Sequence, residues 1–176
     1  MPVIKTRTTY LQMFSPPVVE IAAPRDDVKI STVASPVVEF YRRLYHEVGS
    51  TFHWVDRLVM QDEELVAIIH HVLVDVLVLT ATDEPLGYAE LDRRKEGEIE
   101  LAYFGLFPKA TGQGLGKYLL NHAMRAAWAH SPRRVWVHTC DLDHPAALPN
   151  YLKAGFEVYD EVDIDQWVPE PGEKEE

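Results

Sequence analysis

The chain has 176 residues, a formal net charge of −11 at pH 7 and one cysteine, Cys140. A charge this negative argues against nucleic acid as a partner, because neutralising phosphates takes clustered Lys and Arg. A single cysteine excludes an intramolecular disulfide framework, and the sequence shows neither a membrane-length apolar run nor a signal peptide. We therefore expect one cytoplasmic domain over residues 1–168 without a membrane partner, followed by a disordered acidic tail over 169–176.

The first half of the chain begins with strand patterns and continues with helical ones. Short strands are expected over residues 8–13 and 28–33, which are separated by proline-containing turns. The Ser-Pro pair at 35–36 has the character of an N-cap with proline in the first turn, and predicts a helix that ends before Gly49. A second helix is expected over 61–72, where apolar residues recur at helical spacing behind three acidic residues.

The second half of the chain predicts a meander followed by alternating helices and strands. Antiparallel strands are expected over 74–80, 86–91 and 98–107. Beyond them we expect an amphipathic helix from 115 to about 130, a strand over 134–140, a short helix over 146–154 and a final strand from 156. This order predicts a mixed α/β sheet with helices on both faces.

Three glycines at alternate positions, Gly112, Gly114 and Gly116, lie between an apolar strand and the start of a helix. Glycines let a ligand contact the main chain, and the first turn of a helix offers free N–H groups at its positive end. A dinucleotide fingerprint would need glycine where Lys117 stands, and the spacing of the nucleoside triphosphate P-loop is absent. The pattern therefore predicts a site for a different anionic cofactor.

Two segments together resemble a known family. The segment 111–116, Thr-Gly-Gln-Gly-Leu-Gly, is similar to the pyrophosphate-binding motif Q/R-x-x-G-x-G/A of the GNAT superfamily of acyl-CoA-dependent N-acyltransferases. The segment 147–156, Ala-Leu-Pro-Asn-Tyr-Leu-Lys-Ala-Gly-Phe, is similar to that family's A-x-x-x-Y-x-x-x-G-F. The resemblance covers residues 75–162. It implies a GNAT-like α/β (α+β) fold, with a mixed, mostly antiparallel central sheet and helices on both faces.

The resemblance also implies acetyl-CoA as acyl donor, and no metal. Thr111 departs from the family's Arg or Gln, so Lys109 or Lys117 would have to supply that contact. Gly105 would let the thioester arm approach the strand, or would only mark a bulge. His144 stands where the family often has Asn. The residues expected to bind the cofactor are Phe104, Gly105, Leu106, Thr111, Gly112, Gln113, Gly114, Leu115, Gly116, Lys117 and His144.

Tyr151 matches the tyrosine to which the family assigns protonation of the coenzyme A thiolate. A phenol with a pKa of about 10 is a weaker acid than a thiol at about 8.5, so complete transfer is uphill by roughly 2 kcal/mol. We therefore expect a hydrogen bond that strengthens as charge grows on sulfur. The alternative is a tyrosine that packs its ring in the core and leaves its hydroxyl in water.

Glu98, Glu100 and His138 are the candidates for the general base. The two glutamates share one face of a strand if no bulge intervenes, and some GNAT enzymes use a strand glutamate here directly or through water. Glu100 lies nearer the expected separation of the strands, and His138 is a rival because its ordinary pKa is close to neutrality. Solvent-facing carboxylates are the alternative for both glutamates.

Five residues after the glycine loop could be mistaken for a metal cluster: His138, Cys140, Asp141, Asp143 and His144. Their spacing lacks the pairs that metal sites use. We expect Asp143 to cap the short helix, and acidic neighbours oppose a nucleophilic Cys140.

The acceptor site is expected beside the loop 51–57, because the corresponding loop borders the acceptor in GNAT folds. Its candidates are Phe52, Trp54, Asp56 and Arg57, although Phe52 and Trp54 could instead pack inward as an ordinary staple. The expected reaction is direct attack of a primary amine, on a small or amino-acid-like molecule, on acetyl-CoA. A protein N-terminus or lysine, or a non-catalytic acyl-CoA-binding module, remain alternatives, and a homodimer through a sheet edge is open.

Overall fold

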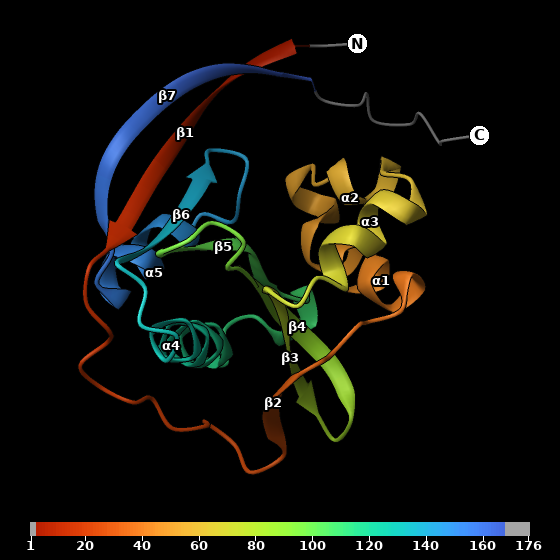
Figure 1. Cartoon of the computed structure of the whole chain (residues 1–176), viewed down its shortest axis with the longest axis vertical. Coiled ribbons are helices and arrows are strands. Elements are labelled where there is room, and N and C mark those ends of the chain that lie inside the picture. Colours follow the sequence, from red (N-terminus) through yellow and green to blue (C-terminus); the bar gives the residue numbers. More distant parts are fainter. Residues whose placement is uncertain (1–2, 168–176) are drawn as a thin grey trace.

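The computed structural model describes residues 3–167, which are arranged around one seven-stranded sheet (Figure 1). The strand order is β2-β3-β4-β5-β6-β1-β7, and every pairing is antiparallel except that of β5 with β6. The elements are β1 (Val3–Met13), β2 (Val28–Thr32), α1 (Val38–Gly49), η1 (Ser50–Phe52), α2 (Asp56–Val59), α3 (Asp62–Ile69), β3 (Val74–Ala81), β4 (Glu84–Asp92), β5 (Glu98–Leu106), η2 (Pro108–Ala110), α4 (Leu115–Trp128), β6 (Arg134–Cys140), α5 (Ala147–Ala154) and β7 (Glu157–Trp167). The predicted mixed, mostly antiparallel α/β fold is confirmed.

Two hydrophobic cores lie on opposite faces of the sheet, because successive strand residues point in opposite directions. On one face, Leu91 of β4 belongs to a core that includes Leu119 of α4 and Tyr151 of α5. On the other face, Tyr88 of β4 packs with Tyr41 of α1 and with residues of α3. Figure 1 shows α4 and α5 on one side of the sheet and α1 to α3 on the other. Helices therefore cover both faces, as predicted.

The helices before the meander differ from the prediction. Ser35 does not cap α1: it has a positive φ of 49°, and the N-cap is Val37, which makes no side-chain capping bond. The second expected helix ends at Ile69, and Val72 beyond it is 82% exposed. The predicted end at residue 72 is wrong, because Val72 continues the helical spacing of apolar residues but is not buried. The short helices η1 and α2 were not predicted.

The N-terminal strand takes an interior place in the sheet. β1 pairs with β6 along one edge and with β7 along the other. It is longer than the predicted segment 8–13, and sequence alone did not indicate its neighbours. The connection from β1 to β2, residues 14–27, passes beneath α4 in Figure 1. We call this connection the strap. The expected tail over 169–176 lies outside the described residues.

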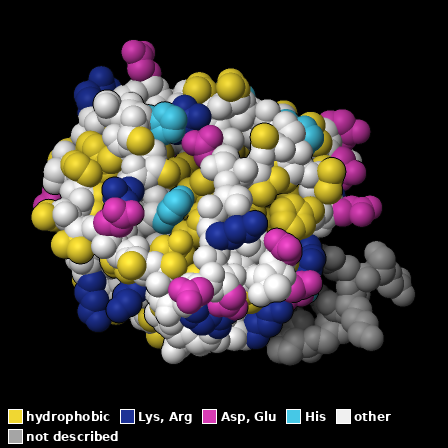
Figure 2. Space-filling view, turned by 90° about the horizontal axis from the view of Figure 1, so that it is seen from below, with side chains coloured by type: hydrophobic (Ala, Val, Ile, Leu, Met, Phe, Trp, Pro, Cys, Tyr) yellow, Lys and Arg dark blue, Asp and Glu magenta, His cyan; other side chains and the backbone are white. Residues whose placement is uncertain are grey.

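The surface carries charges of both signs. On the face seen in Figure 2, Lys and Arg side chains lie in small groups next to Asp and Glu, with apolar side chains reaching the surface between them. None of the helices described within residues 3–167 has the length and apolar character needed to cross a membrane.

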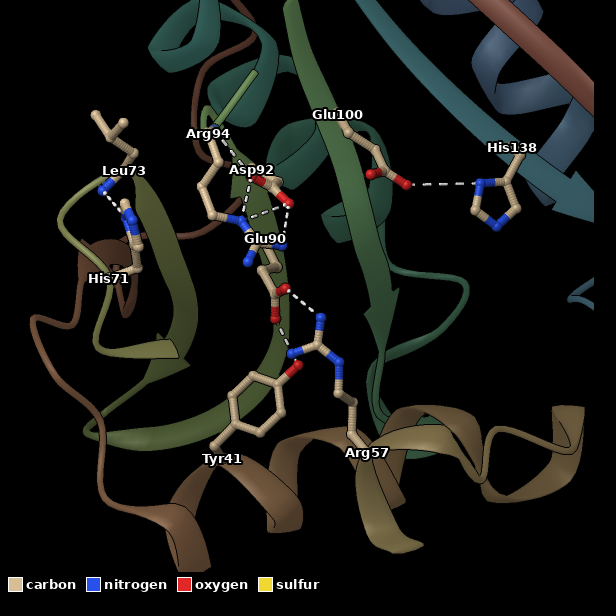
Figure 3. Close-up of polar contacts among 9 residues, drawn as sticks. All are labelled: Tyr41, Arg57, His71, Leu73, Glu90, Asp92, Arg94, Glu100 and His138. Atoms are coloured by element: carbon tan, nitrogen blue, oxygen red, sulfur yellow. Dashed lines mark hydrogen bonds and ion pairs between the residues drawn. The ribbon is translucent and has the colours of Figure 1, made fainter. Parts of the chain in front are cut away.

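A buried ion pair fixes α2 against the sheet. Glu90 on β4 is completely buried, and its Oε2 accepts a hydrogen bond from Arg57 Nη2 at 3.1 Å. The Tyr41 hydroxyl of α1 donates to Glu90 Oε1 (Figure 3). The Arg57 guanidinium lies 5.0 Å from the centre of the Tyr103 ring. Burial raises the pKa of Glu90. The buried Glu90 carboxylate therefore needs the positive charge of Arg57 beside it to remain ionised in the folded protein.

Removal of Arg57 should therefore be strongly destabilising. We expect Arg57→Ala to lower the free energy of unfolding by about 3–5 kcal/mol, because Glu90 would remain buried without its cation. Denaturant titration near neutral pH measures the change. The double variant Arg57→Met/Glu90→Gln removes both charges and keeps an acceptor for Tyr41, so it should recover most of the loss. A single-variant loss below about 1 kcal/mol would contradict this role.

Candidate active site

The site lies where β5 and β6 separate. The two strands pair in parallel only from Glu98 opposite Arg134 to Glu100 opposite Trp136, although both continue further. Beyond Glu100, one edge of β5 has no strand partner within residues 3–167, as expected from the sequence. A cavity of about 420 Å³ fills the gap, and the residues that line it include Ala102, Phe104, Gly105, Leu106, Val137 and His138. Main-chain groups of β5 therefore face a hollow that can accept an extended ligand arm.

The glycine loop forms one end of this cavity. Gly112 and Gly114 both have φ of +77°, a left-handed conformation that glycine adopts without strain, and Gly114 is the N-cap of α4. Gly116 and Lys117, in the first turn of α4, also line the cavity. Free N–H groups at the start of α4 and the Lys117 ammonium suit an anionic group here. The geometry fits a diphosphate.

Two residues expected to bind the cofactor direct their side chains elsewhere. Leu115 is fully buried in the core. Gln113 donates to the carbonyl of Lys109 at 3.1 Å and accepts a hydrogen bond from Arg25 of the strap at 2.7 Å. Thr111 lines the cavity, but its hydroxyl donates to the Pro108 carbonyl at 2.8 Å. The cation at this end of the cavity is thus Lys117, since Lys109 does not line it.

Gly105 is required for a reason that the sequence did not indicate. A Cβ atom at Gly105 would collide with Val48 Cγ1 of α1. The residue lines the cavity, yet the absent side chain makes room for a helix and not for a ligand arm. β5 also contains a bulge, because pairing with β4 shifts from Tyr103 opposite Glu90 to Leu101 opposite Leu91. The bulge lies at residue 102.

Tyr151 of α5 lies in the wall of the cavity. It is 5% exposed, and its ring packs against Phe104 at 6.1 Å and Phe156 at 5.7 Å between centroids. Burial, and then the nearby Asp143, raise the pKa of Tyr151 above its ordinary value. Its proton therefore stays on the hydroxyl at neutral pH, which keeps it a hydrogen-bond donor and makes complete proton transfer more costly.

Glu100 and His138 face each other across the separation of the strands (Figure 3). Glu100 Oε1 lies 3.7 Å from His138 Nδ1. Burial, followed by the charges of Asp92 and Glu90, raises the pKa of Glu100 to about 7. Partial burial lowers the pKa of His138, so its imidazole is neutral near pH 7. A carboxylate that titrates at neutral pH is suited to general base catalysis.

Glu98 has a different environment from Glu100. It accepts a hydrogen bond from Arg134 at 3.1 Å and pairs with Lys95 at 3.0 Å. These partners lower its pKa, with Lys95 the larger cause and Arg134 the next. Glu98 and Glu100 therefore share a face of β5, as predicted, but only Glu100 is free of Lys and Arg partners among the described residues.

The loop 50–55 closes the cavity from the side of α1. Trp54 Nε1 donates to Asp143 Oδ1 at 3.3 Å, and the Phe52 ring meets His144 edge-on at 5.8 Å. All four side chains line the cavity. Asp56 and Arg57, expected beside the acceptor, do not line it, and the guanidinium of Arg57 is bound to Glu90.

The turn after β6 is held by Asp143. Its Oδ2 accepts hydrogen bonds from the Thr139 hydroxyl at 2.7 Å and the Cys140 N–H at 3.0 Å. The prediction that Asp143 caps α5 is wrong, because the N-cap of α5 is Ala146, without a side-chain bond. Burial raises the pKa of Cys140, which disfavours a nucleophilic thiolate. Within residues 3–167, no three His, Cys, Asp or Glu side chains are grouped closely enough to hold a metal ion.

A second, open cavity of about 520 Å³ lies beside Glu100. It is lined by Asp92, Arg94, Lys95, Glu98, Glu100 and Trp136. Sequence reasoning missed this hollow, because it joins the loop after β4 to β5 and β6. Asp92 is bound by Arg94 at 2.8 Å, so its charge is largely balanced. Glu100 thus lines the second cavity, while His138, 3.7 Å from it, lines the first.

The sequence of this domain matches a known family. A model of the acetyltransferase (GNAT) family matches residues 34–156. The chain belongs to the GNAT family. The match includes the glycine loop, β5, β6 and α5, whereas β1, β7 and the strap lie outside it.

Solved structures share the GNAT fold with this chain. A GCN5-related N-acetyltransferase from Sphaerobacter thermophilus has a TM-score of 0.62 at 16% identity, over 94% of this chain and 51% of its own. An aminoglycoside acetyltransferase from an uncultured soil metagenomic sample, in complex with trehalose, has a TM-score of 0.61 at 16% identity, over 74% of this chain and 88% of its own. The ribosomal-protein-S18-alanine N-acetyltransferase from Escherichia coli has a TM-score of 0.60 at 16% identity, over 74% of this chain and 77% of its own.

Some of these structures are longer than the chain. It spans 51% of the Sphaerobacter protein and 59% of a GCN5-related N-acetyltransferase from Kribbella flavida. A search of curated proteins gives no match. At these identities the structures show a shared fold, while the acceptor of each GNAT protein depends on its own site.

The raised pKa of Glu100 predicts a pH-dependent cost to stability. An acid whose pKa is higher in the folded state loses stability as pH rises from its unfolded pKa, 4.5, through its folded pKa, about 7. From about pH 5 to about pH 8.5, wild type should therefore lose stability that Glu100→Gln keeps. The free energy of unfolding of Glu100→Gln should rise by about 2 kcal/mol relative to that of wild type over this range.

Denaturant titration at both pH values measures this difference. Glu98→Gln is the matched control and should change little over this pH range, because the lowered pKa of Glu98 stabilises the ionised fold and that stability is lost only at lower pH. Equal shifts for both variants would contradict the environment assigned to Glu100.

Proposed function

We propose that the protein is an acetyl-CoA-dependent N-acetyltransferase that acetylates a primary amine on a small or amino-acid-like molecule by direct attack. The observation that carries this proposal is the position of Glu100. Its carboxyl has a pKa of about 7, lines the cavity that is open to solvent, and lies 3.7 Å from His138, which lines the cavity with the character of a cofactor site.

The first cavity has the features that coenzyme A requires. The left-handed Gly112 and Gly114 expose main chain at the start of α4, Lys117 supplies a cation, and the unpaired edge of β5 can hydrogen-bond an extended pantetheine arm. When bound there, acetyl-CoA supplies a thioester carbonyl that a neutral amine can attack. The donor N–H groups and the hollow are formed by the glycine loop, α4 and β5 themselves, which supports pre-organised binding.

The residues around the cavities then have distinct roles. Glu100 takes a proton from the bound ammonium group, directly or through water, and His138 is the second group within reach. Tyr151 holds its proton and donates a hydrogen bond toward the sulfur of the leaving group. The acceptor approaches through the open cavity beside Trp136, while Phe52 and Trp54 close the cofactor side.

A protein N-terminus or lysine is the alternative acceptor. The loop 50–55 encloses one side of the site through Trp54 and Phe52, which supports a small acceptor over a long peptide. A domain that binds acyl-CoA without turnover is the alternative outside catalysis. Both alternatives are outcomes of the same experiment.

The decisive experiment combines binding and turnover. Thermal shift and calorimetry with acetyl-CoA should show saturable binding, and a thiol-release assay over a panel of small amines, amino acids and peptides should detect acetylation of small amines above buffer controls. Release only with peptides would transfer the proposal to a protein acceptor. Saturable binding with no release on any acceptor would leave the non-catalytic module, and no binding at all would contradict the proposal.

The pH profile of turnover should report Glu100. At saturating concentrations of both substrates, kcat should rise with pH through an apparent pKa of about 7 and then level off, because only ionised Glu100 can accept the proton. Glu100→Gln should lower kcat by about a hundredfold or more and remove this limb. His138→Asn should keep the limb. If Glu100→Gln keeps it and His138→Asn loses it, the imidazole is the base.

A further inference from the structure

One face of the sheet is left without helices at β6, β1 and β7. Val135 and Val137 of β6 belong to the core beneath α4, so the side chains of Trp136 and His138 point to the opposite face. On that face, the core beneath α1 and α3 contains no residue of β6, β1 or β7 within residues 3–167. Figure 1 shows this division, with α1 to α3 to the right of β5 and with β6 and β1 to its left. Three adjacent strands therefore present side chains that no helix covers.

Four aromatic rings gather on this face: Tyr10 of β1, Trp136 and His138 of β6, and Tyr159 of β7. The centre of the Tyr10 ring lies 6.4 Å from that of Trp136, 5.7 Å from that of His138 and 6.1 Å from that of Tyr159. The rings of Trp136 and His138 are stacked at 6.0 Å. Tyr159 is 41% exposed, and the His138 side chain is 46% exposed. We call these four side chains the aromatic shelf, and partly exposed rings grouped in this way suit the binding of a further apolar group.

The aromatic shelf begins at the proposed general base. Trp136 is the β6 residue directly opposite Glu100, and both residues line the open cavity. His138 Nδ1 lies 3.7 Å from Glu100 Oε1, and Tyr10 is opposite His138 on the next strand. Neighbouring strands are about 4.8 Å apart, so a group bound at Glu100 lies one strand spacing from Trp136 and two from Tyr10.

The charges around the open cavity are matched in pairs. Asp92 is bound by Arg94 at 2.8 Å, and Glu98 by Lys95 at 3.0 Å. Glu100 is the carboxylate of this lining without a Lys or Arg partner among the described residues. One ammonium group therefore finds an unpaired carboxylate here, whereas a second charge on the same ligand would have to compete with an existing ion pair.

Arg134 limits the aromatic shelf at its far end. Its guanidinium lies 5.9 Å from the centre of the Trp136 ring and 5.2 Å from that of the Tyr159 ring. The same group donates hydrogen bonds to Glu98 at 3.1 Å and to Gln12 at 2.9 Å. A cation already packs against these two rings, so the aromatic shelf suits an uncharged flat group better than a further cation.

We propose that the acceptor is an arylalkyl primary amine, whose amino group is bound at Glu100 and whose aromatic ring packs on the aromatic shelf at Trp136 and Tyr10. A link of two carbon atoms between ring and nitrogen spans about 5 Å, which is one strand spacing. This inference rests on the proposed function and narrows its substrate class. Tyr10 and Tyr159 lie outside residues 34–156, the segment that matches the family.

The experiment compares two amines of the same carbon skeleton length. At saturating acetyl-CoA, kcat/KM of wild type should be at least about fivefold higher for 2-phenylethylamine than for 2-cyclohexylethylamine, whose puckered ring cannot stack. We call this ratio the ring preference. 1,4-Diaminobutane, which offers a second cation in place of the ring, should also be acetylated with a lower kcat/KM than 2-phenylethylamine.

Variants of the aromatic shelf test which residues carry the ring preference. Trp136→Leu keeps an apolar side chain but removes the flat ring, so the ring preference should fall below about twofold. Tyr10→Leu should also lower it, whereas Tyr10→Phe retains the ring and should keep it. Phe14→Leu is the matched control, because Phe14 is another exposed ring, 59% exposed, that lines neither of the two cavities. It should keep the ring preference.

The outcomes separate this inference from the proposed function. Equal kcat/KM of wild type for the two amines, or a ring preference that survives Trp136→Leu, would overturn the inference and leave the acetyltransferase standing. Circular dichroism checks the fold of each variant, and if Trp136→Leu does not fold, the comparison of Tyr10→Leu with Tyr10→Phe decides in the same way. Acetylation of peptides alone would overturn the inference, and release of thiol with no amine at all would overturn it together with the proposed catalysis.

Discussion

The separation of β5 from β6 is the constraint on which the rest of the structure depends. Parallel pairing stops after Glu100 meets Trp136, and each strand then follows its own neighbour, β4 on one side and β1 on the other. The gap exposes unpaired main chain, which a sheet normally avoids. Packing on both faces maintains it: α1 fits against Gly105 from one side, and Tyr151 packs against Phe104 from the other. The hollow is thus a property of the whole sheet.

Charge in the site is controlled by which carboxylates have partners. Glu90 and Glu98 each have an arginine, whereas Glu100 forms an ion pair with neither Lys nor Arg among the described residues and has His138 at 3.7 Å. Because Glu90 and Asp92 are placed on the same side of the sheet, they add repulsion to the burial that already raises the pKa of Glu100. Arg57 therefore acts on Glu100 from a distance, since its positive charge opposes the rise in the pKa of that carboxyl.

Local patterns made much of the fold predictable. The glycine loop, Tyr151 and the strand that carries Glu98 and Glu100 could be placed because each is set by neighbours within a few residues. The roles of Arg57, Gly105 and Gln113 could not, because their partners Glu90, Val48 and Arg25 are distant in sequence. For the same reason, spacing could not distinguish Glu100, which lacks a lysine or arginine partner, from Glu98, which has two.

The interior position of β1 has a consequence for the synthesis of the chain. Val3 pairs with Trp167 and Thr8 with Cys140, so β1 can complete its pairing only after both β6 and β7 have been synthesised. Until then both edges of β1 are unpaired, and unpaired strand edges favour aggregation. The half of the sheet that bears His138 therefore rests on pairings between residues far apart in sequence, which form slowly.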